Sequence, residues 1–147
     1  MTGVPVYDLD RFAVPADQRF RLTTSVRYSD LDPNGHVNHA NYLPYLEECR
    51  IAFRNTLVAD FAEVTGVSWP IAEITVRYRK SLTYPGDVIV EVAPLAVGRT
   101  SLTLGYGLFA DGQVAAMAMT RSVCVDRTTG RPTPMSDVLA AHLKTLI

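Results

Sequence analysis

The stretch "NYLPYLEECRIAFRNTLVA", residues 41–59, decides the fold class, because its apolar side chains recur at steps of three and four residues. Such spacing is typical of an amphipathic helix with one buried stripe. The stripe consists of Tyr42, Tyr45, Leu46, Cys49, Phe53 and Leu57. Pro44 limits where the helix can begin, since its missing N–H is harmless only in the first turn. We therefore expect a helix that begins close to Asn41, whose side-chain oxygen can cap a free backbone N–H.

On both sides of this helix, apolar and polar residues alternate, which is the period of a strand with one buried face. The runs that alternate or are largely apolar are residues 19–28, 72–80, 88–97, 99–109 and 113–126. In the second run we expect Ile74, Val76 and Tyr78 to point inward, with Arg77 and Arg79 on the opposite face. Short turns join the last four runs, so neighbouring strands are expected to be antiparallel.

One long helix and a sheet of about five antiparallel strands predict a two-layer α+β domain. The length of 147 residues fits a single domain, with a core over residues 18–136 and a short closing helix over 136–146. The last strands are apolar on both faces, although one helix can cover only one face. This surplus of apolar surface predicts a homo-oligomer.

Composition excludes several classes of protein. The net charge is −1, and no block of Lys and Arg is present, so we expect neither nucleic acid nor an anionic membrane as a partner. We also expect no signal peptide and no transmembrane helix, because the N-terminal residues lack the apolar core of a signal and no long apolar run follows. Cys49 and Cys124 are not in a CxxC pair, which favours reduced thiols and a cytoplasmic location.

The polar stretch "SDLDPNGHVNHANY", residues 29–42, precedes the helix and holds the candidate functional residues. Its first part, "DLDPNG", begins like a calcium-binding EF-hand loop. However, Asn41 stands where that loop needs a glutamate, and a strand precedes it. His36 and His39 could be zinc ligands, but no further cluster of Cys and His supports this. We therefore expect no metal site and no redox cofactor.

Two other interpretations of this stretch remain open. A solvated tight turn explains Pro33, Asn34 and Gly35, but not the two histidines that follow. In (R)-specific enoyl hydratases, the Asp and His of D-x-N-P-x-H lie five residues apart. Asp32 and His36 lie only four apart, so a hydratase is an alternative.

Thioester hydrolysis is the chemistry that this stretch suits best. The reaction needs a carboxylate that activates water or attacks the carbonyl, together with N–H donors for the developing oxyanion. Asp32 can supply the carboxylate. The N–H groups at the helix start, near residues 38–42, can supply the donors, helped by Asn or His side chains.

The stretch "VRYSDLDPNGHVNHANYLPYLEECRIAF", residues 26–53, resembles the hotdog-fold thioesterases of the 4-hydroxybenzoyl-CoA thioesterase type. The likeness continues in "ITVRYRKSLTYPGDVIVE", "GRTSLTLGYGLF" and "VCVDRTTGRPTPM", and so extends over about residues 18–136. It implies the hotdog fold, a five-stranded antiparallel sheet wrapped around one long central helix. It also implies a homodimer or homotetramer with active sites between subunits, and hydrolysis of a fatty or aryl acyl-CoA without any cofactor, CoA being part of the substrate.

The resemblance also implies roles for individual residues. Asp32 falls on the catalytic aspartate of the family, and His39 on a histidine used by its Tol-Pal-associated members. "DLDPNGHVNH" resembles D-L-D-M-N-Q-H-V-N-N of plant acyl-ACP thioesterases, which implies catalytic roles for Asp32, Asn34 and His36. Those plant enzymes carry Glu-Cys where this chain has Lys80-Ser81.

The remaining expected site residues have supporting roles. We expect turn or oxyanion roles for Gly35, Asn38, Asn41 and Tyr42, and contacts to the CoA phosphates from Arg77, Arg79 and Arg99. Asp30 is expected to close the turn by an Asx-type hydrogen bond. The alternatives to an acyl-CoA thioesterase are an enzyme whose partner is an acyl carrier protein and a non-catalytic acyl-binding protein.

Overall fold

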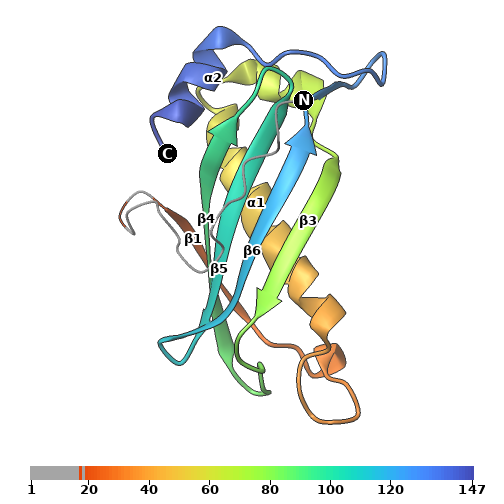
Figure 1. The fold of residues 1–147 in the computed structure, drawn as a ribbon, viewed down its shortest axis with the longest axis vertical. Helices are drawn as coiled ribbons and strands as arrows, with labels where there is room; N and C mark the ends of the chain where they lie inside the picture. The colour runs from red at the N-terminus through yellow and green to blue at the C-terminus, as the bar shows by residue number, and fades with distance from the viewer. Residues whose placement is uncertain (1–16, 18) are drawn as a thin grey trace.

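The computed structural model describes residue 17 and residues 19–147, which form one helix packed on an antiparallel sheet (Figure 1). The five-stranded sheet has the order β1-β4-β5-β6-β3. Its strands are β1 (Phe20–Ser25), β3 (Ile71–Tyr78), β4 (Asp87–Val97), β5 (Ser101–Ala110) and β6 (Gln113–Val123). The long helix α1 (Tyr42–Val58) crosses one face of this sheet diagonally. The expected α+β hotdog arrangement is therefore confirmed.

Smaller elements complete the fold. Two short strands, β2 (Val67–Ser68) and β7 (Val125–Asp126), pair antiparallel, and three 3-10 turns cover Tyr28–Asp30, His39–Asn41 and Ala62–Gly66. The closing helix expected over 136–146 is α2 (Asp137–Lys144), and its N-cap is Ser136. In the described part of the chain, no helix combines the length and apolarity needed to cross a bilayer.

The buried face of α1 is the stripe expected from the sequence. Every residue of that stripe is buried: Tyr42, Tyr45, Leu46, Cys49, Phe53 and Leu57. Pro44 is the third residue of the helix, so it lies in the first turn, where its missing N–H does no harm. Asn41 precedes the helix, but its side chain makes no capping hydrogen bond. Asn38 instead caps the preceding 3-10 turn by accepting from the N–H of Ala40 at 2.9 Å.

Strand β3 lies at one edge of the sheet, and its inner face is open. Tyr78, Val76 and Ile74 pair with residues of β6 that face α1, so their side is as expected. Tyr78 and Ile74 are nevertheless 45% and 42% exposed, and only Val76 is half-buried. The expected burial of Ile74 and Tyr78 is wrong for the single chain, because α1 packs mainly against β4 and β1, and its contact with β3 through Tyr42 leaves part of Tyr78 exposed.

Candidate active site

A cleft of about 380 Å³ opens beside the start of α1, at the end of the sheet where β3 finishes. Three segments enclose it: the loop before α1, the first turn of the helix, and the residues that follow β3. The lining residues are Asp32, His36, Val37, His39, Tyr42, Tyr78, Arg79, Lys80 and Ser81. The structure thus brings together five of the expected site residues, namely Asp32, His36, His39, Tyr42 and Arg79. In Figure 1 this loop lies at the opposite end of the sheet from α2.

The loop that carries Asp32 is a narrow hairpin. The N–H of Asp32 donates to the His36 carbonyl at 2.8 Å, and the N–H of Gly35 donates to the Asp32 carbonyl at 3.0 Å. Gly35 has φ +78°, a left-handed conformation that glycine adopts without strain. His36 also forms an antiparallel bridge with Thr83, which fixes the loop against the segment after β3.

The Asp32 carboxylate is held on one side and lines the cleft on the other. Its Oδ1 accepts a hydrogen bond from the N–H of Asn34 at 2.8 Å, an Asx turn. The described residues form no hydrogen bond to Oδ2, so this oxygen is available to a ligand. The Asx-type hydrogen bond that we expected from Asp30 is therefore made by Asp32, whereas the Asp30 side chain accepts from the N–H of Arg27 at 3.3 Å. Asn34 contributes its backbone to this turn, and neither Asn34 nor Gly35 lines the cleft.

The backbone donors at the helix start are mostly used inside the chain. The N–H of Asn38 donates to the Asp30 carbonyl at 2.9 Å, and the N–H of Asn41 to the Asn38 carbonyl at 2.8 Å. The N–H of Ala40 is occupied by the Asn38 side chain. The N–H of Tyr42 donates to the Ala40 carbonyl. Of the expected oxyanion donors over residues 38–42, the N–H of His39 is thus the one without a partner among the described residues, and His39 lines the cleft.

Two tyrosines form an aromatic wall of the cleft. The Tyr42 hydroxyl donates to the Lys80 carbonyl at 3.1 Å and accepts from the N–H of Leu82 at 3.2 Å. The Tyr78 hydroxyl donates to the His39 carbonyl at 2.7 Å, and the two tyrosine rings meet edge to face at 4.9 Å. Burial raises the pKa of both tyrosines, so each keeps its proton as a donor at neutral pH.

The basic residues expected to hold CoA are only partly brought together. Arg79 lines the cleft, beside Lys80. Arg77 lies on the other face of β3, opposite Met117. Arg99 lies in the turn between β4 and β5, at the far end of the sheet. Of the three arginines, only Arg79 borders the cleft.

Sequence reasoning missed four lining residues: Val37, Tyr78, Lys80 and Ser81. Tyr78 was expected to point inward, but nothing in the alternation tied it to the polar loop. For Lys80 and Ser81 the resemblance did indicate a position near the site, since they occupy the place where the plant enzymes have Glu-Cys. The exposed helical glutamates, Glu47 and Glu48, do not line the cleft.

Asp30 lies beneath the loop as a buried carboxylate. Its Oδ2 accepts from the Tyr45 hydroxyl at 2.6 Å and from Arg27 Nε at 3.2 Å. Burial works to raise the pKa of Asp30, but the hydrogen bonds from Tyr45 and Arg27 outweigh it and hold the pKa below its usual value. The Tyr45 pKa is raised by burial and by the Asp30 charge, so this pair is a phenol donating to a carboxylate.

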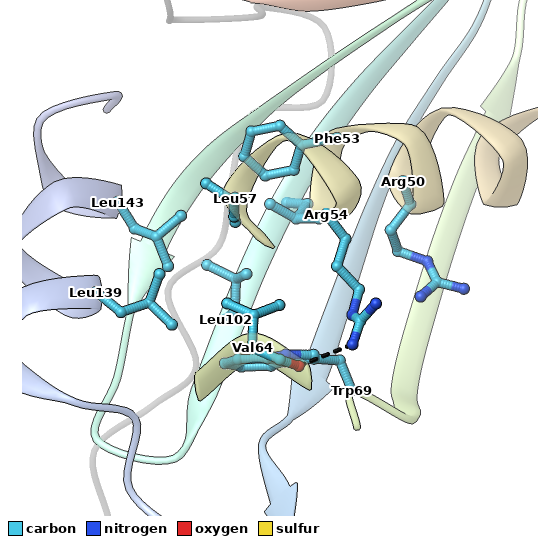
Figure 2. A pocket seen from close by; sticks show the side chains of 10 residues that line it. Arg50, Phe53, Arg54, Leu57, Val64, Trp69, Leu102, Leu139 and Leu143 are labelled. Atoms are coloured by element: carbon cyan, nitrogen blue, oxygen red, sulfur yellow. Dashed lines mark hydrogen bonds between the residues drawn. The ribbon is translucent and has the colours of Figure 1, made fainter. Parts of the chain in front are cut away.

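A second, apolar cavity lies at the other end of α1 (Figure 2). It measures about 30 Å³ and lies between Phe53 and Leu57 of α1, Trp69, and Leu139 of α2. Arg54 crosses it and donates to the Val64 carbonyl at 2.8 Å. The lining is apolar apart from the side chains of Arg50 and Arg54.

Metal ligands are not grouped in the described residues. Over residue 17 and residues 19–147, no three side chains of His, Cys, Asp or Glu are placed to hold a metal ion. His36 and His39 both line the cleft without such a third ligand.

Known proteins match most of the chain. The family model of the thioesterase-like superfamily matches residues 26–143. A 1,4-dihydroxy-2-naphthoyl-CoA hydrolase of Thermosynechococcus vestitus is 30% identical over 128 residues, covering 82% of this chain and 85% of that protein. The long-chain acyl-CoA thioesterase FadM of Escherichia coli is 27% identical over 126 residues, covering 83% and 95%. The crystal structure of a thioesterase from Thermus thermophilus, complexed with coenzyme A and zinc, has a TM-score of 0.75 and 30% identity, covering 88% of this chain and 93% of that one.

Proposed function

Because this chain belongs to the thioesterase-like superfamily and is a thioester hydrolase, we propose that it hydrolyses a fatty or aryl acyl-CoA to the free acid and CoA. The observation that carries this proposal is the cleft that places the Asp32 carboxylate beside His39 and the aromatic wall. The names of the two relatives cover both acyl types, since one acts on a naphthoyl-CoA and the other on long-chain acyl-CoA.

Asp32 is the proposed general base. It takes a proton from a water molecule, and the hydroxide adds to the thioester carbonyl to give a tetrahedral oxyanion. The oxyanion collapses, the C–S bond breaks, and CoA leaves as a thiolate that takes up a proton from solvent, while Asp32 releases the proton that it took from water and is restored as a carboxylate. A thiol has a pKa near 8.5, so the leaving group needs no strong general acid. In the alternative, Asp32 attacks the carbonyl itself and water then hydrolyses the resulting anhydride.

The N–H of His39 is the proposed oxyanion donor. The neighbouring N–H groups of Asn38, Ala40 and Asn41 are used within the chain, and the Tyr78 hydroxyl holds the His39 carbonyl. A donor fixed in this way needs little rearrangement as charge develops on the substrate oxygen. The imidazoles of His36 and His39 border the same cleft and are proposed to contact the substrate carbonyl or the water.

Arg79 and Lys80 are the proposed contacts to the phosphates of CoA. Both line the cleft, and positively charged side chains make strong hydrogen bonds to phosphate. The Lys80 ammonium lies 3.7 Å from the Asp111 carboxylate. This exposed pair contributes little to stability, so a phosphate can replace the carboxylate at small cost. CoA belongs to the substrate in this proposal, and no further cofactor takes part.

A second copy of the chain is the proposed partner, joined at the β3 edge. An antiparallel pairing of two β3 strands about Thr75 places Glu73 opposite Arg77 of the second copy and Ile74 opposite its Val76. Opposite charges and apolar pairs then face each other on the two sides of the sheet. This pairing covers the exposed inner face of β3 and gives a homodimer, from which a homotetramer is a further step. The proposed location is the cytoplasm, in line with the free thiols of Cys49 and Cys124.

Thiol release from a panel of short, long and aryl acyl-CoA esters tests the proposal, with wild type and Asp32→Asn in parallel. The asparagine keeps an oxygen that can accept from the N–H of Asn34, so the turn is retained while the base is lost. We expect kcat/KM to fall by about 100-fold or more. Asp60→Asn, an exposed aspartate outside the cleft, is the matched control and should leave the rate unchanged.

Two results would count against this function. Activity that survives Asp32→Asn rejects Asp32 as the base and turns attention to His36 and His39. Absence of thiol release by the wild type from every acyl-CoA rejects the substrate class, and the same assay with acyl carrier protein esters then tests the alternative partner.

A further inference from the structure

The loop that carries Asp32 and His36 begins at Asp30, and hydrogen bonds to the Asp30 carbonyl close it. The Asp30 carbonyl accepts from the N–H of Asn38 at 2.9 Å and from Asn41 Nδ2 at 3.0 Å. A single backbone oxygen therefore joins the base of the loop to the residue where the loop returns and to the residue that precedes α1.

The side chain of Asp30 makes the second connection, to the interior of the molecule. Tyr45 lies on α1 and is 1% exposed, and its hydroxyl donates to Asp30 Oδ2 at 2.6 Å. Arg27, which follows β1, donates to the same oxygen from Nε, and its N–H lies 3.3 Å away. Asp30 is thus bonded to the end of β1 on one side and to α1 on the other.

We propose that Asp30 and Tyr45 are positioning residues for hydrolysis, whose hydrogen bond sets the place of the Asp32 loop relative to the start of α1. This inference rests on the proposed function of the cleft. Neither side chain lines the cleft, so neither touches the substrate. Both act indirectly, by placing the two groups that are proposed to act on the substrate. These are Asp32, which lies on the loop, and the N–H of His39, which lies at the helix start.

Placement matters because the two groups act on the same carbonyl. The base must direct water at the carbonyl carbon while the donor meets the carbonyl oxygen. A displacement of about 1 Å between such groups can lower a rate by about 100-fold. The Tyr45 hydroxyl links the Asp30 carboxylate to the buried face of α1, so its loss lets the loop move relative to the helix.

Tyr45→Phe and Tyr106→Phe form a matched pair for the test. Each removes one hydroxyl from a buried tyrosine: Tyr45 bonds to Asp30, whereas Tyr106 bonds to Thr120 at 2.9 Å within the core. We expect kcat to fall by about 10-fold to about 100-fold in Tyr45→Phe, with KM little changed, and to stay near the wild-type value in Tyr106→Phe. The thermal unfolding midpoint should fall in both variants, and further in Tyr45→Phe, because a hydrogen bond to a carboxylate contributes more than one between two hydroxyls.

Amide hydrogen exchange supplies a readout that needs no turnover. The N–H groups of Gly35 and Asn38 should exchange faster in Tyr45→Phe than in Tyr106→Phe, because the loop is no longer held to α1. Asp30→Asn, which keeps an acceptor oxygen for Tyr45, should retain more activity than Asp30→Ala.

The outcomes separate this inference from the proposed function. An active wild type whose kcat and loop exchange are the same in Tyr45→Phe overturns the positioning role and leaves the acyl-CoA proposal intact. Equal losses of kcat in Tyr45→Phe and Tyr106→Phe also overturn it, because the effect would then be one of general stability. If the wild type hydrolyses no thioester, the proposed function is rejected, and the positioning role is rejected together with it.

Discussion

At the scale of single residues, Glu91 is the most buried carboxylate of the sheet. It is 3% exposed and accepts from Arg19 Nη1 at 2.7 Å and from Arg21 Nη2. Burial works to raise the pKa of Glu91, but the hydrogen bonds from the two arginines outweigh it and hold the pKa below its ordinary value of 4.5. A carboxylate with a lowered pKa in the folded state stabilises the protein above its unfolded-state pKa, and this contribution is lost as the pH falls through the folded-state pKa.

Acid should therefore destabilise the protein partly through Glu91. The contribution of Glu91 to the free energy of unfolding should be nearly constant from pH 7 to pH 5. This contribution should decrease once the pH is lower than about 4.5, the ordinary pKa of a glutamate. Glu91→Gln should reduce stability at pH 7 by about 1–3 kcal/mol and make the decline in acid shallower. Urea unfolding at a series of pH values measures both effects. The exposed Glu47, changed to Gln, is the control, and a decline equally steep in Glu91→Gln would contradict the assignment.

Substitutions at Gly35 test whether the loop needs the left-handed backbone conformation at this position. No atom lies within 4 Å of a Cβ added at Gly35, so a substitution there meets only the strain of φ +78°. Gly35→Ala should lower the free energy of unfolding by about 1–2 kcal/mol. Gly35→Asn should cost less, because Asn tolerates this conformation. Urea unfolding of the three proteins compares them, and an Ala variant as stable as the wild type would show that the loop relaxes without strain.

At the scale of elements, the open β3 edge carries the prediction about assembly. Ile74→Lys should prevent the proposed pairing, because it places a charge opposite Val76 of the second copy, on the side that pairing would bury. Light scattering after size exclusion should show a dimer or tetramer for wild type and a monomer for Ile74→Lys. Val138→Lys, on the exposed surface of α2, is the control and should stay oligomeric. A monomeric wild type would remove the β3 pairing from the proposal.

The sequence predicts individual helices and strands better than it predicts which strands lie side by side. The stripe of α1 and the facing of β3 follow from periods of 3.6 and 2, which are local properties of the chain. The exposure of Ile74 does not follow, because the order β1-β4-β5-β6-β3 puts β3 at an edge, and alternation carries no information about strand order. Arg99 shows the same limit. The eleven-residue β4 spans about 36 Å, and thus separates Arg99 from the cleft end.

At the scale of the whole molecule, the cleft is made from segments that only folding brings together. Asp32, His36 and His39 could be chosen from one stretch of sequence, because a carboxylate and imidazoles before a helix start suit thioester chemistry. Tyr78 and Lys80 lie about forty residues further on. Their segment is held at the cleft by the bridge that pairs His36 with Thr83 and by the hydrogen bond from the Tyr42 hydroxyl to the Lys80 carbonyl. Hydrogen bonds to the backbone leave no periodic trace in a sequence, so the sequence did not place Tyr78 at the cleft, although Arg79 of the same segment was expected at the site.

The closure of the loop at Asp30 has a consequence for how such a protein can diverge. Hydrogen bonds join the two arms of the loop, from Asp32 to His36, and a bridge pairs Leu31 with Val37. The tip, residues 33–35, lies outside the core, and Asn34 and Gly35 are exposed. Mutations at the tip therefore alter an exposed segment that does not line the cleft, while α1 and its buried stripe stay in place. Such changes can accumulate without loss of the fold or of the residues that line the cleft.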